Sequence, residues 1–136
     1  MMNYLVCKQL KGKIKCSISI GGISDLNMTI ENHPEIGKVC EEIVPNFEKD
    51  RQEELYKRSP TKWVDALLTN TRFLLLHGMA DTHVYYKQSV ILAARMSEFG
   101  ISNEIKLYKN DNHGITGHIK DVERSCIRFL KENSKK

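Results

Sequence analysis

The segment that most constrains the fold is a short, uninterrupted apolar run, Phe-Leu-Leu-Leu at 73–76, which a His-Gly pair stops at once. A strand buried on both faces of a parallel sheet has this pattern. Apolar and polar residues alternate in two further segments, at 14–20 and at 104–108, as they do in strands with one buried face. The sequence therefore predicts a central strand and two others, of which 104–108 suits a position nearer a sheet edge.

Helical patterns separate these strands. Apolar residues recur at helical spacing at 1–11, 84–99 and 119–131, and Gly100 follows the second segment as a C-terminal cap would. Strands that alternate with helices form βαβ units with right-handed crossovers and a parallel sheet. The prediction is an α/β fold with about three parallel strands flanked by helices.

The stretch 23–60 fits this alternation less well. Prolines and glycines interrupt it, and two short helices are predicted inside it, at 38–44 and at 49–57. The second ends before Pro60, as expected from the restricted backbone of a residue that precedes proline. Because the stretch has few long apolar runs, we expect it to cross the top of the domain and not to enter its core.

The composition is that of an ordinary globular domain, with 136 residues, 40% of them hydrophobic and 28% charged. No apolar run reaches the roughly 18 residues of a membrane span, so no membrane partner is expected. The net charge of +4 comes from dispersed basic residues without an aromatic and basic groove, so no nucleic acid is expected. Cys7, Cys16, Cys40 and Cys126 form no CxxC pair, which predicts free thiols in a reducing compartment such as the cytoplasm, and neither a metal nor a cofactor.

Polar clusters, HGMADTH and KNDNHG, follow the second and third predicted strands. Asp81 lies five residues past Leu76, and His113 lies five residues past Tyr108. If the two strands are neighbours, both side chains emerge at the carboxyl ends of the strands, where open α/β sheets bind ligands. An aspartate that accepts a hydrogen bond from a histidine fixes its tautomer, so the histidine can act as a general base near neutral pH. Asp81 and His113 are therefore the candidate catalytic residues.

Other roles stay open for these residues. Asp81 can cap a helix that begins near Val84, and His113 can belong to a turn set by its neighbours. A metal site made of His77, Asp81 and His83 is a further alternative, although their spacing matches no common site.

The stretches RSPTKW, FLLLHGMADTHVYYKQSVILAARMSEFG and EIKLYKNDNHG resemble the C-terminal part of the prolyl oligopeptidase family of serine hydrolases, which includes dipeptidyl peptidases and acylaminoacyl peptidases. The family's HG-x-x-D-x-x-V segment is matched at 77–84, and its later His-Gly pair is matched at 113–114. The resemblance covers 57–130 best. It implies an α/β-hydrolase fold in which Asp81 is the acid and His113 the base of a catalytic triad.

The resemblance also implies a missing part. In the family, a G-x-S-x-G-G nucleophile elbow directly precedes the helix that residues 1–5 resemble. Ser19 is followed by Gly21 but has Ser17 in place of the preceding glycine, and it lacks the sharp strand-to-helix turn of such an elbow. We therefore expect 1–136 to be the C-terminal portion of an α/β-hydrolase catalytic domain without its nucleophilic serine. Such a chain is inactive alone and acts on a peptide or acyl substrate when the upstream segment completes it. Tyr85 and Tyr86 are candidates for the substrate side of the pocket.

A second hypothesis makes the chain a non-catalytic binding or assembly module. A sheet whose first strand is 14–20 exposes an edge there, and unpaired edges recruit other strands. Lys13 and Lys15 weaken that tendency without abolishing it. This hypothesis predicts a homodimer that pairs the two exposed edges.

Overall fold

A parallel sheet of three strands organises the molecule. The computed structural model of the chain describes residues 1–67 and 70–133. The strands lie in the order β1 (Cys16–Ile20), β2 (Arg72–Gly78) and β3 (Asn103–Tyr108). The predicted α/β class is confirmed, and so is the prediction that the third strand lies at an edge.

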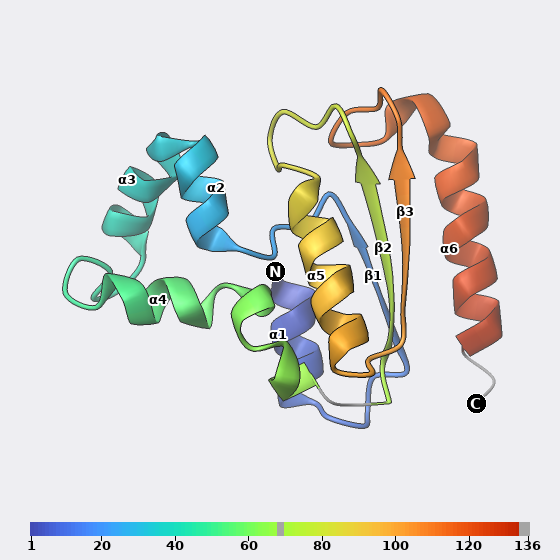
Figure 1. The fold of residues 1–136 in the computed structure, drawn as a ribbon, viewed down its shortest axis with the longest axis horizontal. Coiled ribbons are helices and arrows are strands. Elements are labelled where there is room, and N and C mark those ends of the chain that lie inside the picture. Colours follow the sequence, from blue (N-terminus) through green and yellow to red (C-terminus); the bar gives the residue numbers. More distant parts are fainter. Residues whose placement is uncertain (68–69, 134–136) are drawn as a thin grey trace.

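Helices cover both faces of this sheet (Figure 1). α1 (Met2–Gln9) and α5 (Lys87–Glu98) pack on one face, and α6 (Ile119–Asn133) packs on the other. The three helices predicted around the sheet are confirmed, although α5 begins at Lys87 and not at 84. No helix within the described ranges is both long and apolar enough to cross a bilayer.

The side chains of β2 feed two cores. Phe73 and Leu75 pack with α1 and α5, whereas Leu74 and Leu76 pack with α6. All four are at most 1% exposed. Burial of each such side chain stabilises the fold by about 1.5–3 kcal/mol relative to exposure, so an uninterrupted apolar run is what a central strand requires.

Between β1 and β2 the chain makes a helical excursion that lies to the side of α1 and α5 in Figure 1. It comprises α2 (Leu26–Asn32), α3 (Pro34–Ile43) and α4 (Arg51–Lys57), and the short helices η1 (Pro60–Lys62) and η2 (Val64–Leu67) lead on towards β2. The excursion has a small core of its own, made of Leu26, Cys40, Phe47 and Leu55. The stretch enters neither core of the sheet, as expected, but the sequence did not show that it packs a core of its own.

The sequence-based description of the excursion is wrong at its start. No helix was expected at 26–32, but Asp25 caps α2 by accepting a hydrogen bond from the Met28 N–H at 3.1 Å. Pro34 does not interrupt a helix; it begins α3, where a residue without an N–H fits because the first turn has no carbonyl partner for one. α3 therefore starts four residues before the predicted 38–44.

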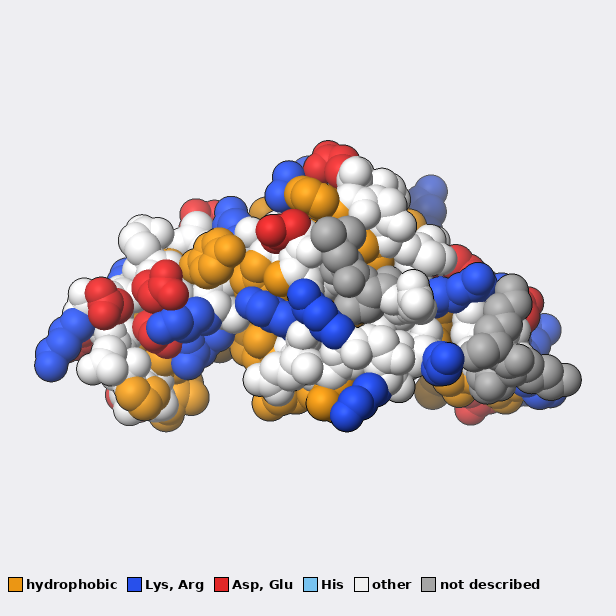
Figure 2. Space-filling view, turned by 90° about the horizontal axis from the view of Figure 1, so that it is seen from below, with side chains coloured by type: hydrophobic (Ala, Val, Ile, Leu, Met, Phe, Trp, Pro, Cys, Tyr) orange, Lys and Arg blue, Asp and Glu red, His pale blue; other side chains and the backbone are white. Residues whose placement is uncertain are grey.

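The strands of Figure 1 point upwards, so their carboxyl ends share one end of the molecule. Figure 2 shows the opposite end, where Lys and Arg side chains are scattered and no histidine side chain is visible. The loops that carry His83 and His113 follow the last residues of β2 and β3, so they lie at the carboxyl end of the sheet.

Candidate active site

The ends of β2 and β3 bring Asp81 and His113 together. The two strands are parallel, with Gly78 paired to Tyr108, so they end at the same level. Asp81 follows Gly78 by three residues, and His113 follows Tyr108 by five. The strands are neighbours, as the sequence argument for the pair required.

A hydrogen bond joins the two side chains. Nδ1 of His113 lies 2.8 Å from Oδ2 of Asp81. The Asp81 side chain is 0% exposed, whereas that of His113 is 44% exposed. Because an ionised carboxylate can only accept, Nδ1 carries the hydrogen, and in the neutral ring Nε2 keeps its lone pair. Nε2 has no hydrogen-bond partner within 1–67 and 70–133, so it is free to accept a proton.

The other oxygen of Asp81 is held by the backbone. Oδ1 accepts hydrogen bonds from the N–H groups of His83 at 2.8 Å and Val84 at 2.9 Å. Burial by itself would raise the pKa of Asp81, but the hydrogen bonds from Val84, His113 and His83 outweigh burial and hold the pKa below its ordinary value. Asp81 is therefore an ionised acceptor at neutral pH.

These backbone contacts also decide the capping alternative. α5 begins at Lys87, and its N-cap, Tyr86, makes no side-chain cap. Asp81 closes the turn at 81–84 and does not cap α5. The turn delays the helix, which explains why the predicted start at 84 is wrong.

A second aspartate shapes the loop that carries His113. The carboxylate of Asp111 accepts hydrogen bonds from the N–H groups of Asn112 at 2.9 Å and Gly117 at 3.2 Å. It also lies 2.7 Å from Nδ1 of His118, which ends the short helix η3 (Thr116–His118). The hydrogen bond from His118 is the main cause of a lowered pKa at Asp111. The sequence did not single out Asp111, because nothing in its spacing shows that its carboxylate folds back on its own loop.

Gly21, just past the end of β1, lies against the ring of His113. Its φ of +58° lies in the left-handed region, and a Cβ there would lie 2.9 Å from both Cε1 and Nδ1 of His113. Only glycine leaves the imidazole in its place at this position, so all three strands help to position the pair.

A cavity of about 400 Å³ opens beside His113. Its walls come from the N-terminus, the loop after β1, the corner between α2 and α3, and the loop after β2. The lining residues are Met1, Gly21, Ile23, Thr29, His33, Glu35, Ile36, His83, Val84 and His113.

Tyr85 and Tyr86, the candidates for substrate contact, are not among the described residues that line this cavity. Their rings meet edge to face at 5.3 Å, and the ammonium of Lys87 lies 5.4 Å from the ring centre of Tyr85. Their role in substrate binding stays a prediction.

The alternative of a metal site made of His77, Asp81 and His83 is not supported by the described residues. Within the described ranges, no three His, Cys, Asp or Glu side chains are arranged to hold an ion. The backbone N–H of His83 donates a hydrogen bond to Asp81. The ring of His83 lies edge to face with the ring of His113, with 5.4 Å between the ring centres. His77 is enclosed, with Nε2 lying 3.0 Å from the carboxylate of Asp81.

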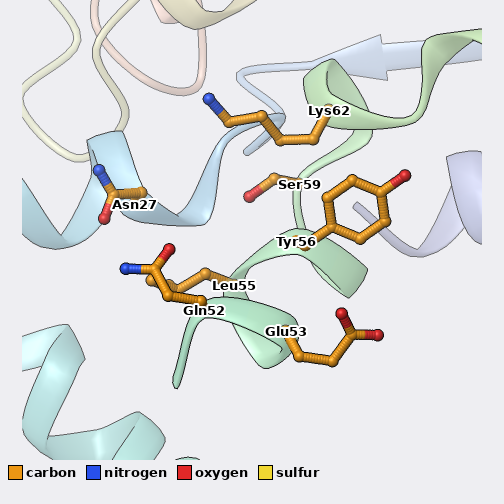
Figure 3. A pocket seen from close by; sticks show the side chains of 7 residues that line it. All are labelled: Asn27, Gln52, Glu53, Leu55, Tyr56, Ser59 and Lys62. Atoms are coloured by element: carbon orange, nitrogen blue, oxygen red, sulfur yellow. The ribbon is translucent and has the colours of Figure 1, made fainter. Parts of the chain in front are cut away.

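A second cavity, of about 480 Å³, lies on the excursion (Figure 3). It is built on α2, α4 and the two residues that flank the start and form the end of η1, Ser59 and Lys62, and it contains none of the candidate catalytic residues. The labelled lining residues are Asn27, Gln52, Glu53, Leu55, Tyr56, Ser59 and Lys62.

Three buried serines, Ser24, Ser59 and Ser89, are engaged in structural hydrogen bonds. Ser24 Oγ donates to the carbonyl of Gln88 at 2.9 Å, and Ser59 Oγ accepts from the N–H of Leu26 at 2.9 Å. Ser89 Oγ lies 2.7 Å from a ring nitrogen of His77. None of these hydroxyls is hydrogen-bonded to His113.

Comparison with known proteins places these features in a family. The sequence model described as "Prolyl oligopeptidase family" matches residues 1–136. The chain belongs to the prolyl oligopeptidase family. A probable dipeptidyl-aminopeptidase B of Arthroderma gypseum is 34% identical over 67 residues, and dipeptidyl peptidase family member 1 of Caenorhabditis elegans is 29% identical over 63. These matches cover 48% and 46% of this chain but only 7% and 8% of the relatives, so the chain is similar to a small part of each.

Solved structures of peptidases share the fold of this chain. The uncomplexed acylaminoacyl peptidase of Pyrococcus horikoshii matches with a TM-score of 0.80 at 20% identity, over 97% of this chain and 22% of that one. A puromycin-hydrolyzing peptidase of Mycobacterium tuberculosis matches with a TM-score of 0.64 at 25% identity, over 81% of this chain and 16% of that one. The three strands and their helices are therefore part of an α/β-hydrolase fold.

Proposed function

We propose that Asp81 and His113 are the acid and the base of a serine-hydrolase triad that cleaves peptide or related acyl bonds. The observation that carries this proposal is the 2.8 Å hydrogen bond between the enclosed Asp81 carboxylate and Nδ1 of a half-exposed His113 beside a cavity. Membership of a serine peptidase family supports the same reaction class.

In this mechanism Nε2 of His113 takes the hydroxyl proton of a serine as the serine oxygen attacks the substrate carbonyl carbon. The protonated ring then gives that proton to the departing amine or alcohol, and an acyl-enzyme remains. A water molecule, deprotonated by the same nitrogen, hydrolyses the acyl-enzyme and restores the serine. Asp81 keeps its negative charge throughout and stabilises the imidazolium.

We further propose that the serine comes from a segment that precedes Met1. Met1 lines the same cavity as His113, and α1 begins at Met2, directly beside it. A residue placed just before α1 would therefore enter the cavity wall. The serines of β1 and of the buried positions, by contrast, belong to the packed fold.

A labelling experiment tests both steps. A fluorophosphonate probe reports a serine activated by a histidine, and a chromogenic dipeptide or p-nitrophenyl ester reports turnover. We expect the chain alone to remain unlabelled, and the chain preceded by its encoded upstream segment to be labelled and to turn over. His113→Ala should abolish both signals. His118→Ala is the matched control, because His118 also binds an aspartate through Nδ1, at 2.7 Å, on the same loop.

Two results contradict the proposal. Labelling of the chain alone that His113→Ala abolishes would show an internal nucleophile and refute the upstream serine. Wild-type turnover by the His113→Ala variant of the longer chain would refute the role of His113.

A second function, assembly through the sheet edge, is favoured by one observation. β1 pairs only with β2 among the described strands, and Ile20 at its end is 44% exposed. We propose a homodimer that joins two β1 edges as the alternative state of the isolated chain. Ile20→Lys should then convert the dimer to a monomer in sedimentation experiments, whereas Ile105→Lys, on the opposite edge strand and 38% exposed, should not. A wild-type monomer would refute this alternative.

A further inference from the structure

His77 is a polar ring in a completely enclosed position at the end of β2. The residue is 0% exposed, yet both of its ring nitrogens have partners. Nδ1 lies 2.7 Å from Oγ of Ser89. Nε2 lies 3.0 Å from Oδ2 of Asp81 and 2.9 Å from the carbonyl oxygen of Val84.

These partners determine the tautomer of His77. The carboxylate of Asp81 and the carbonyl of Val84 can only accept, so Nε2 carries a hydrogen and donates to both. The hydroxyl of Ser89 can donate, so in the neutral ring Nδ1 accepts from it. A neutral ring protonated at Nε2 therefore satisfies every polar atom without burying a further charge.

We propose that His77 is a positioning residue for the Asp81–His113 pair, and that the hydroxyl of Ser89 holds its ring in place. The inference rests on the proposed function, because it extends the acid–base pair to a chain of four side chains. The order of the chain is Ser89, His77, Asp81 and His113, with distances of 2.7, 3.0 and 2.8 Å.

The two histidines converge on one oxygen. Oδ2 of Asp81 accepts from Nε2 of His77 and from Nδ1 of His113, while Oδ1 accepts from the N–H groups of His83 and Val84. Four donors on two oxygens leave the carboxylate no free rotation. Without His77, Oδ2 would be oriented only by its hydrogen bond to His113 and by the backbone donors to Oδ1, so the acceptor of His113 would be held less firmly.

Ser89 ties this chain to the helical layer. It lies in the first turn of α5, whose packing against the sheet is set by residues such as Leu92 and Met96. The position of α5 therefore affects the position of Asp81 through the ring of His77, which is not exposed to solvent.

Nuclear magnetic resonance of the chain tests this inference without any turnover. Nitrogen shifts of ¹⁵N-labelled histidine separate the two neutral tautomers from the cation. We expect His77 to be neutral and protonated at Nε2 at neutral pH. His77→Phe should raise the pKa of Asp81, because the carboxylate loses one donor. It should also speed exchange of the His113 Nδ1 proton by roughly fivefold to tenfold, the factor for about one hydrogen bond.

His77→Gln is the conservative variant, because its amide can still donate to Asp81, and it should restore most of both values. His33→Ala is the control for a histidine outside the His113 loop, because its ring is hydrogen-bonded to Glu35 and not to Asp81, and it should leave both unchanged. Protonation of His77 at Nδ1 alone, or an Asp81 pKa and a proton exchange rate that stay at wild-type values in His77→Phe, would overturn the inference. If His77→Phe does not fold, the inference is tested by the tautomer of His77 in the wild type and by the Asp81 pKa and the His113 Nδ1 exchange rate in His77→Gln. Failure of the longer chain to hydrolyse substrate would leave these readouts intact, so the two proposals fail separately.

Discussion

Substitution of Gly78 tests how closely the β2 end and the His113 loop are packed. A Cβ at this position would lie 2.2 Å from the carbonyl oxygen of Asn112 and 2.4 Å from that of Asp111. Both atoms belong to the backbone, so rotation of a side chain cannot relieve the overlap. The loop can retreat only by lengthening the hydrogen bond in which the Ala80 N–H donates to the Asp111 carbonyl at 2.8 Å.

The cost of Gly78→Ala follows from these contacts. Overpacking of a tight contact costs about 1–3 kcal/mol, and weakening of one backbone hydrogen bond adds about 1 kcal/mol. We therefore expect a loss of roughly 3 kcal/mol in the free energy of unfolding, equivalent to about 10 °C in Tm for a chain of this size. Urea unfolding followed by fluorescence measures it, because Trp63 is the sole tryptophan and is 1% exposed.

Gly114→Ala is the matched control in the same region. The nearest atom to a Cβ at Gly114 is a methyl carbon of Thr116 at 3.4 Å, which is an ordinary contact. It should change the free energy of unfolding by no more than about 1 kcal/mol. If Gly78→Ala unfolds at the same urea concentration as wild type, the close packing of the two loops is refuted.

Three further predictions concern the site and the thiols. Because the folded-state pKa of Asp81 is lowered, its contribution to stability is complete above the unfolded-state pKa and is lost as pH falls through the folded-state value. Asp81→Asn should therefore flatten the acid side of a plot of unfolding free energy against pH. An unchanged acid slope would contradict this. Gly21→Ala should displace the ring of His113, and it should reduce the fluorophosphonate labelling of the longer chain by about tenfold or more while the fold remains, as circular dichroism will show. Burial raises the pKa of the Cys7 and Cys40 thiols, so both should react with a thiol reagent at pH 8 much more slowly in the folded chain than in urea; equal rates would show that they are accessible.

The sheet was predictable because its signal is local. The run at 73–76 needs apolar residues on both faces, and the register of β2 with its neighbours follows from parallel pairing. The helices of the excursion were not predictable, because α2 has only seven residues and only two of them, Leu26 and Thr29, are buried. A helix so short depends on its cap and on tertiary packing more than on periodicity. The Asp25 cap was readable in principle, but the Pro34 that follows the helix was misread as a break.

The site divides in the same way. Asp81 and His113 were predictable because each follows a strand, and parallel strands end at one edge. The contacts that hold these two side chains were not predictable, because they join residues that meet only in the folded chain. Gly21 follows β1 and contacts His113 beyond the end of β3, with β2 between the two strands, and Ser89 contacts His77 from a helix. Sequence spacing reports which residues leave a strand together, but not which atoms meet beyond it.

The cavity beside His113 joins two separately packed units. Its floor is the sheet end, whereas Thr29 and Ile36 come from the excursion, which has its own core. Buried Gln88 of α5 couples them: its Oε1 accepts from the N–H groups of Ser24 and Asp25, and its amide donates to Thr29 Oγ1 at 2.9 Å. Because Ser89 is the next residue of α5, the same turn of helix positions both the cavity wall and the hydrogen-bonded chain that ends at His113. A shift of that turn would therefore change the cavity and the position of His113 together.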